Sequence, residues 1–126
     1  MRNQPTYHFF KNTMYALQGL KDIIKTERSF QIELILVLIF APIPMWLDID
    51  LSEKLLMIST LMGLLIAESI NSAIERVVDL VTKDYHPMAG RAKDVGSTIV
   101  FYLLIFLSIV LFSVVWGAIL WDHCLV

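Results

Sequence analysis

Three long apolar segments constrain the fold of this chain more than any other feature of its sequence. They run from 29 to 47, from 51 to 81 and from 96 to 121. Each is long enough to cross a hydrocarbon core of about 30 Å as a helix that rises about 1.5 Å per residue. With 57% apolar residues and a mean hydropathy of +0.69, the composition is that of an integral membrane protein. We therefore expect an all-α membrane protein in which residues 1–126 form one domain with three transmembrane helices.

The segment before the first span, residues 6–28, has a different pattern. Apolar side chains recur there every three or four residues, and charged or amide side chains take the opposite face. This pattern predicts an N-terminal amphipathic helix on the membrane surface, which serves as an electrostatic anchor, a headgroup-binding element or both. The segment lacks the features of a cleaved secretory signal, so we expect it to stay in the mature protein.

The basic residues predict the orientation in the membrane. Most of them precede the first span or lie near the turn after the second span, whereas only Lys54 lies near the first turn. By the positive-inside rule, the N-terminus is cytoplasmic and the C-terminus is outside. The net charge of −2 gives no argument for a nucleic-acid partner, and we expect none. Cys124 is the only cysteine, which excludes an intrachain disulfide.

A polar stripe interrupts the second span. Glu68, Asn71, Glu75 and Asp79 fall on one face of a helix, because they are spaced at i, i+3, i+7 and i+11. A helix that enters hydrocarbon near residue 51 reaches the inner boundary near Glu68 and Asn71, so Glu75 lies beyond it. Polar groups at this depth either carry function or hold neighbouring helices together, and both interpretations stay open here.

Residues 82–95 are mixed in charge and include Pro87 and Gly90, which predicts a polar loop of the kind a nucleotide needs. Phosphoryl transfer requires a divalent cation, nearby positive charge and a base. Glu75 and Glu27 can hold Mg²⁺, and Lys93 can pair with phosphates. Glu68, partly desolvated at the boundary, can accept a proton from a lipid hydroxyl.

By contrast, Arg76 and Asp79 taken alone are expected to be solvated surface. The chain contains neither a Walker loop nor a protein-kinase glycine loop, so a kinase activity needs another scaffold.

The polar residues in and after the second span also form a recognisable pattern. It consists of Glu68-Ser69-Ile70-Asn71-Ser72-Ala73-Ile74-Glu75, then Val77-Val78-Asp79, Tyr85-His86 and Gly90-Arg91-Ala92-Lys93-Asp94-Val95-Gly96-Ser97. This pattern resembles the small membrane diacylglycerol kinase family of bacteria. Gly19-Leu20, Glu27 and Trp46-Leu47-Asp48-Ile49-Asp50 fit as well, so the resemblance covers nearly the whole chain.

The resemblance implies a homotrimer of three-span subunits in a bacterial inner membrane, with active sites shared between neighbours. It implies that Glu68 is the general base, that Asn71 supports the reacting groups, and that Glu27 and Glu75 hold Mg²⁺. The implied ATP contacts are His8, Tyr15, Glu27, Glu75, Asp84, Tyr85, His86, Lys93 and Asp94. The implied lipid contacts are Ser29, Phe30, Gln31, Ile32, Glu33, Trp46, Lys54, Glu68 and Ser97.

The resemblance predicts an ATP-dependent phosphorylation of 1,2-diacylglycerol to phosphatidate at the cytoplasmic membrane surface, in lipid recycling and phospholipid metabolism. Undecaprenol is the alternative acceptor, although the Gly90-Arg91-Ala92-Lys93 sequence favours the diacylglycerol branch. A small proton-coupled transporter that uses Glu68 as its carrier group is an alternative of another class. A purely structural membrane subunit is a third.

Overall fold

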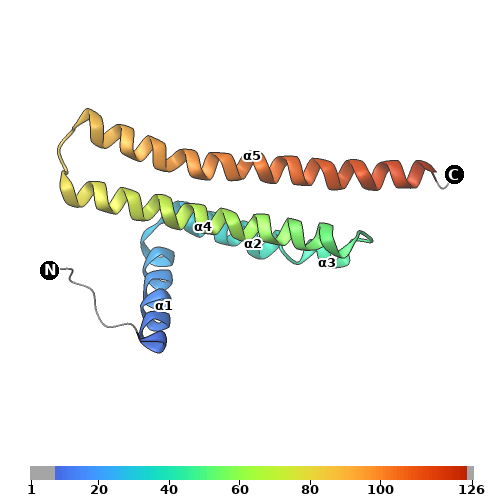
Figure 1. Ribbon diagram of the computed structural model, residues 1–126, viewed down its shortest axis with the longest axis horizontal. Helices are drawn as coiled ribbons and strands as arrows, with labels where there is room; N and C mark the ends of the chain where they lie inside the picture. The colour runs from blue at the N-terminus through green and yellow to red at the C-terminus, as the bar shows by residue number, and fades with distance from the viewer. Residues whose placement is uncertain (1–7, 125–126) are drawn as a thin grey trace.

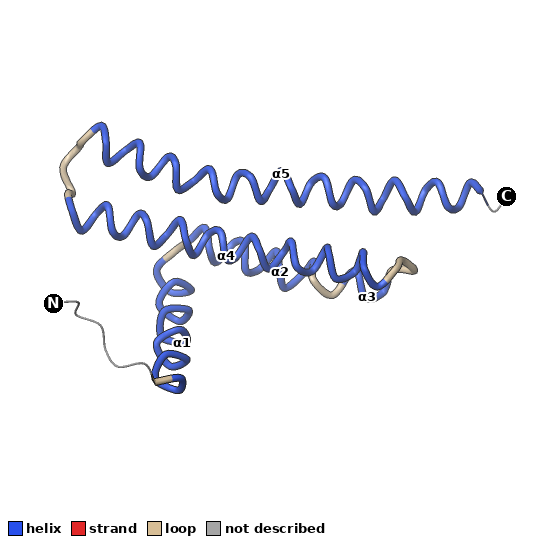
Figure 2. The backbone as a smooth tube through the Cα atoms, in the orientation of Figure 1, coloured by secondary structure: helices blue, strands red, loops and turns tan. Residues whose placement is uncertain are grey.

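The computed structural model describes residues 8–124, and within this range every regular element is a helix (Figure 1). The helices are α1 (Phe9–Thr26), α2 (Arg28–Phe40), α3 (Ile43–Trp46), α4 (Leu51–Val81) and α5 (Pro87–Cys124). Only short connections separate them (Figure 2). The predicted all-α fold is confirmed for the described part of the chain.

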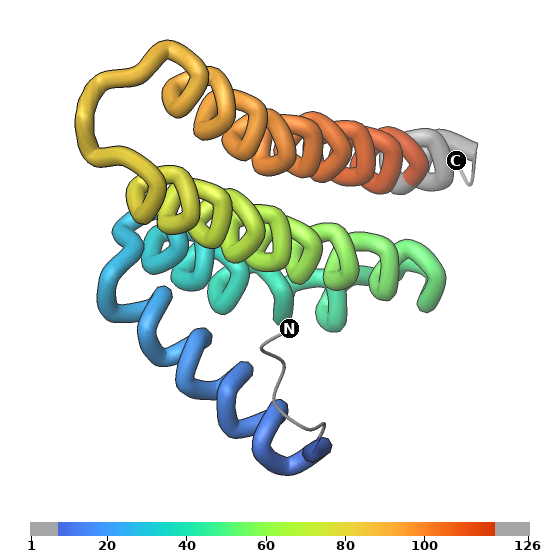
Figure 3. The backbone as a smooth tube through the Cα atoms, turned by 60° about the vertical axis from the view of Figure 1, so that its left-hand side comes forward, coloured from blue at the N-terminus to red at the C-terminus, as the bar shows by residue number. Residues whose placement is uncertain are grey.

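Helix α4 is the centre of the arrangement, because it contacts α2, α3 and α5. Helices α2, α4 and α5 run side by side, while α1 turns away from them (Figures 1 and 3). The segments Arg28–Trp46, Leu51–Val81 and Pro87–Gly117 are long and apolar enough to cross a membrane. This agrees with the expectation of three spanning helices.

The first span is interrupted near its end, where α2 stops at Phe40 and the short α3 follows. Pro42 and Pro44 explain the interruption, because neither has the amide hydrogen that a continuous helix would donate to the carbonyl four residues earlier. The turn that follows leads into α4, where the Asp50 backbone amide donates to the Glu53 carboxylate at 3.1 Å. This contact is half of a capping box and fixes the start of α4.

The third span begins earlier than predicted, at Pro87 rather than at residue 96. Residues 87–95 are therefore helical, and the prediction of a loop throughout this stretch is wrong. A proline marks a turn or the first position of a helix, and here it occupies the first position. His86 stabilises this helix start, because its Nδ1 accepts a hydrogen bond from the Met88 amide at 3.2 Å. The polar residues of the stretch extend the helix beyond its apolar part.

The hydrophobic core joins the end of α1 to α2, α4 and α5. Its main cluster contains Ile23, Phe30, Val37, Leu61 and Leu65, with Leu107 of α5 packed against it. A second cluster, of Met57, Val110 and Val114, lies between α4 and α5 near the connection from α3 to α4. These contacts fix the face of α4 that carries the polar stripe.

Candidate active site

Two residues of the polar stripe on α4, Glu68 and Asn71, are buried, and so is the neighbouring Ser72. Glu68 is 6% exposed, Asn71 8% and Ser72 3%. The Asn71 amide nitrogen Nδ2 donates to Oε1 of Glu75 at 3.3 Å. Oδ1 of Asn71 is buried and accepts no hydrogen bond from the described residues. Because buried polar atoms nearly always find a partner, this oxygen is a natural position for a ligand contact.

Helix α5 comes very close to Asn71 at Gly96. A Cβ atom at position 96 would lie 2.6 Å from Oδ1 of Asn71 and 3.4 Å from Cγ2 of Ile74. Only a glycine permits this approach, so Gly96 belongs to the construction of the site. In the sequence, Gly96 belongs to the family pattern that includes Lys93 and Asp94, but that pattern does not reveal that packing against Asn71 requires a glycine.

Acidic side chains from three parts of the chain gather around Glu68. Glu27 and Glu75 lie within electrostatic range of Glu68. Glu33 of α2 also lies within electrostatic range of Glu68. Oε2 of Glu33 is buried and has no hydrogen-bond partner among the described residues. The structure thus brings the predicted base, the two predicted metal ligands and one predicted lipid residue to the same region.

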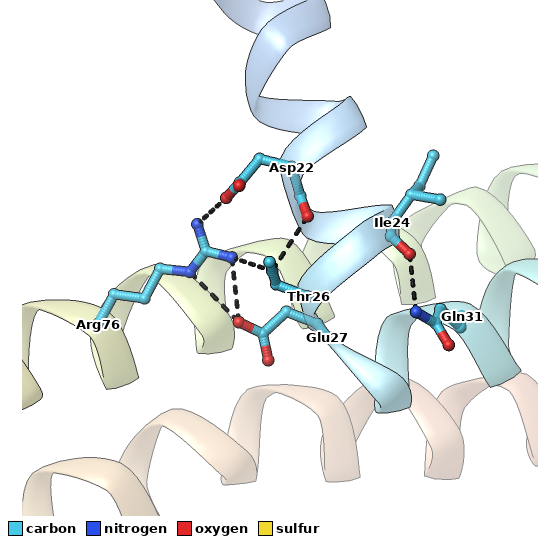
Figure 4. Close-up of polar contacts among 6 residues, drawn as sticks. All are labelled: Asp22, Ile24, Thr26, Glu27, Gln31 and Arg76. Atoms are coloured by element: carbon cyan, nitrogen blue, oxygen red, sulfur yellow. Dashed lines mark hydrogen bonds and ion pairs between the residues drawn. The ribbon is translucent and has the colours of Figure 1, made fainter.

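Arg76 of α4 connects this region to the end of α1 (Figure 4). Its Nη2 donates to Oε1 of Glu27 at 3.0 Å and to Oγ1 of Thr26 at 2.7 Å. Its Nη1 pairs with the Asp22 carboxylate. The side chain of Arg76 is 46% exposed, in line with the expected solvated surface, but the expectation did not include its ion pairs with Asp22 and Glu27. Asp22 and Thr26 escaped sequence reasoning, because no spacing rule relates them to a residue about fifty positions away.

Several predicted nucleotide contacts meet at the turn between α4 and α5. Asp84, Tyr85, His86 and Lys93 line one shallow cleft there, together with Asp79. Nζ of Lys93 donates to Oδ1 of Asp79 at 2.6 Å, and Lys93 also lies within electrostatic range of Glu75. The Lys93 ammonium group therefore links the cleft to Glu75 of the polar stripe.

Other predicted nucleotide contacts lie outside this cleft. His8 precedes the first residue of α1, Tyr15 lies within α1 and is 56% exposed, and Asp94 is an exposed residue of α5.

The predicted lipid residues are divided between two regions. Ser29, Ile32 and Ser97 are exposed, whereas Phe30 is 2% exposed and belongs to the core of the single chain. Trp46 and Lys54 lie near the opposite end of α4, and Lys54 is about 21 Å along the helix from Glu68 at 1.5 Å per residue.

Gln31 has a defined contact, because its Nε2 donates to the Ile24 carbonyl at 2.8 Å (Figure 4). It satisfies a carbonyl that the end of α1 would otherwise leave unpaired.

The donor chemistry of the site fits Mg²⁺. The described residues of one chain contain no group of three or more His, Cys, Asp or Glu side chains placed to hold a metal ion. Mg²⁺, however, is usually bound by one or two carboxylates, with waters and substrate phosphates completing its shell. Glu27 and Glu75, both within electrostatic range of Glu68, would be the carboxylates of such a site.

Comparison with known proteins identifies the relatives of this chain. The family model for prokaryotic diacylglycerol kinase matches residues 14–118. The diacylglycerol kinase of Haemophilus influenzae is 39% identical over 113 residues, which cover 90% of this chain and 92% of that protein. The diacylglycerol kinase of Escherichia coli is 38% identical over 109 residues, 86% of this chain and 85% of that protein. The undecaprenol kinase of Bacillus subtilis is 30% identical over 89 residues, 71% of this chain and 72% of that protein.

The family model covers the buried stripe, the Arg76 cluster and the cleft at the α4–α5 turn, and the relatives align over most of the chain. As the pattern from Glu68 to Ser97 predicted, this chain belongs to the prokaryotic diacylglycerol kinase family.

Proposed function

We propose that this protein transfers the γ-phosphate of ATP to the 3-hydroxyl of 1,2-diacylglycerol and so produces phosphatidate and ADP. The observation that carries the proposal is the buried Glu68, placed among Asn71, Glu75 and Glu27 in a chain of the diacylglycerol kinase family. A buried carboxylate at the expected inner membrane boundary of a spanning helix is suited to meet a lipid hydroxyl there. The nucleotide approaches from the α4–α5 turn.

In this mechanism, Glu68 accepts the proton of the lipid hydroxyl as its oxygen attacks the γ-phosphorus. The bond between that phosphorus and the oxygen bridging to the β-phosphate breaks, and ADP leaves with this oxygen. Lys93 pairs with phosphate oxygens and offsets their negative charge. Glu27 and Glu75 would hold Mg²⁺, which when bound would supply positive charge to the phosphates. Asn71 orients Glu75 through its hydrogen bond and offers Oδ1 to the bound groups.

The assembly and location of the enzyme complete the proposal. We propose a homotrimer in a bacterial inner membrane, with a cytoplasmic N-terminus and α1 lying on the membrane surface. Apolar Met14, Leu17 and Leu20 of α1 are exposed in the single chain, in keeping with a surface position. In the apolar part of α5 11% of residues are buried, against 50% in α4, which leaves apolar surface for lipid or a neighbouring subunit. Sites shared between subunits would supply contacts that one chain lacks.

Undecaprenol is a second candidate acceptor, since an undecaprenol kinase is 30% identical to this chain. The purified protein in mixed micelles, given labelled ATP and Mg²⁺, tests both. We expect phosphate transfer to diacylglycerol to exceed transfer to undecaprenol at equal mole fraction. The reverse ranking would assign the polyprenol activity, and no transfer to either lipid from a folded oligomer would refute the kinase proposal.

A further inference from the structure

Glu27 occupies a joint that neither neighbouring helix holds by itself. Its backbone is extended, with φ −106° and ψ 110°, between the last residue of α1 and the first of α2. The Glu27 amide donates to the Ile23 carbonyl at 2.9 Å, and the Glu27 carbonyl accepts from the Gln31 amide at 3.1 Å. These bonds fix the main chain of the joint. They leave the direction of the Glu27 side chain to be set by another contact.

Arg76 provides that contact from α4 (Figure 4). Its Nε and Nη2 donate to the same carboxylate oxygen, Oε1 of Glu27, at 3.2 and 3.0 Å. The other donations, to Thr26 and Asp22, hold the last turn of α1. A guanidinium has donors in a rigid planar fork, so several bonds at once define one orientation of its partners. Arg76 also places positive charge at the carbonyl end of α1, which is favourable.

The charges of the cluster keep Glu27 suitable for a cation. Arg76 meets two carboxylates, Asp22 and Glu27, so one negative charge remains in the cluster. The bonds from Arg76 to Glu27 both fall on Oε1, which leaves the lone pairs of Oε2 as the position for a further ligand. Asp22 thus offsets the charge of Arg76 that would otherwise fall on Glu27 alone.

Arg76 also follows Glu75 directly on α4, so the residue that grips Glu27 is the neighbour of the second carboxylate. Successive side chains on a helix point about 100° apart. Glu75 accordingly turns to Asn71, while Arg76 turns to the joint. One rigid helical segment therefore sets the positions of both carboxylates relative to Glu68.

We propose that Arg76 is a positioning residue: it ties the α1–α2 joint to α4 and holds the Glu27 carboxylate in the acidic group around Glu68, where it binds the divalent cation together with Glu75. The inference rests on the proposed function, in which Glu27 and Glu75 hold Mg²⁺. Arg76 contacts neither reacting group in this scheme. It acts through Glu27, so its loss should weaken cation binding more than the chemical step.

The test compares Arg76→Ala with Lys25→Ala, which removes an exposed cation from the last turn of α1. We measure the Mg²⁺ concentration that gives half-maximal transfer and kcat at saturating Mg²⁺. Loss of a residue that orients a metal ligand typically weakens metal binding about 10- to 100-fold. We expect a rise in the half-maximal Mg²⁺ concentration of about tenfold or more for Arg76→Ala, with kcat changed less than about threefold, and no change for Lys25→Ala. An unchanged Mg²⁺ requirement in active Arg76→Ala would overturn the inference.

A second measurement does not depend on turnover. Mn²⁺ binding, followed by electron paramagnetic resonance with a non-hydrolysable ATP analogue, should weaken in Arg76→Ala and, to a lesser degree, in Arg76→Lys. Lysine keeps the charge but not the planar fork, so this variant also serves if Arg76→Ala does not fold. If both variants fold, unchanged Mn²⁺ affinity in both would contradict the inference. If only Arg76→Lys folds, unchanged Mn²⁺ affinity in that variant would contradict it.

A double-mutant comparison separates action through Glu27 from any other role. If Arg76 acts through Glu27, removing it from a Glu27→Gln background should weaken Mn²⁺ binding by less than about twofold more. Additive losses would show an independent role and overturn the inference. Absence of transfer by the unmodified protein at every Mg²⁺ concentration would instead refute the proposed function, while the Mn²⁺ measurements would still judge the role of Arg76.

Discussion

Gly96→Ala should damage the active site at a position that touches no substrate in the proposed mechanism. The added Cβ would lie 2.6 Å from Oδ1 of Asn71, where ordinary van der Waals contact begins at 3.4 Å. Either α5 moves away from α4 or the Asn71 amide rotates. In both cases the 3.3 Å hydrogen bond from Asn71 to Glu75 is strained or lost.

Three contributions set the size of the effect. Overpacking of this kind typically costs about 1–3 kcal/mol. Losing the hydrogen bond costs about 1 kcal/mol more, while alanine in place of glycine within a helix returns about 1 kcal/mol. The expected net loss of unfolding free energy is therefore about 1–3 kcal/mol. Because a misplacement of about 1 Å can cost about 100-fold in rate, we expect kcat to fall by about 10- to 100-fold.

Gly63→Ala is the matched control for this prediction. Its Cβ would meet only the end of the flexible Leu103 side chain, at 3.0 Å. Unfolding of both variants in mixed detergent micelles, followed by circular dichroism, gives the stability difference, and transfer rates give kcat. Gly63→Ala should change stability by less than about 1 kcal/mol and kcat by less than about twofold. Equal stability and activity in the two variants would refute the role assigned to the close approach at Gly96.

Four further predictions concern the side chains and the metal of the site. Gln31→Ala should lower the unfolding free energy by about 1 kcal/mol, because the Ile24 carbonyl loses its partner; unchanged micellar unfolding would contradict this. Lys93→Ala should raise the KM for ATP about tenfold or more, since a hydrogen bond to a charged group contributes about 1.5–3 kcal/mol. Asp79→Asn keeps that lysine and should alter stability by less than about 1 kcal/mol, as for an exposed ion pair. Removing Mg²⁺ with a chelator should stop phosphate transfer, and adding excess Mg²⁺ should restore it. Full activity after chelation would exclude a metal role.

The spans and the family could be predicted from the sequence because their signals are local. Twenty or more apolar residues identify a spanning helix whatever surrounds them, and the pattern that includes Glu68, Asn71 and Glu75 lies within two turns of α4. The early start of α5 could not be separated from a loop, because Pro87 is compatible with both. The break at Glu27 lies within two residues of the predicted boundary between the amphipathic segment 6–28 and the span from 29, because the hydrophobic pattern changes there.

The Arg76 cluster was beyond sequence reasoning for a different reason. Asp22, Thr26 and Arg76 meet only because the chain bends between α1 and α2 and reverses between α3 and α4, and no periodicity within one helix reports such a contact. Likewise, the need for glycine at 96 arises from the packing of α5 against Asn71. Both features depend on distances between helices, which a pattern along the chain does not contain.

The most direct test of the central claim is transfer by Glu68→Gln in mixed micelles with Mg²⁺, ATP and diacylglycerol. Glutamine keeps the size of this buried side chain but cannot accept the hydroxyl proton, and loss of a general base typically costs about 100- to 10,000-fold. Glu53→Gln, at the far end of α4, is the control and keeps the oxygen that caps the helix. We expect such a loss of kcat in folded Glu68→Gln and not in Glu53→Gln. Activity in Glu68→Gln within about threefold of that of Glu53→Gln would contradict it.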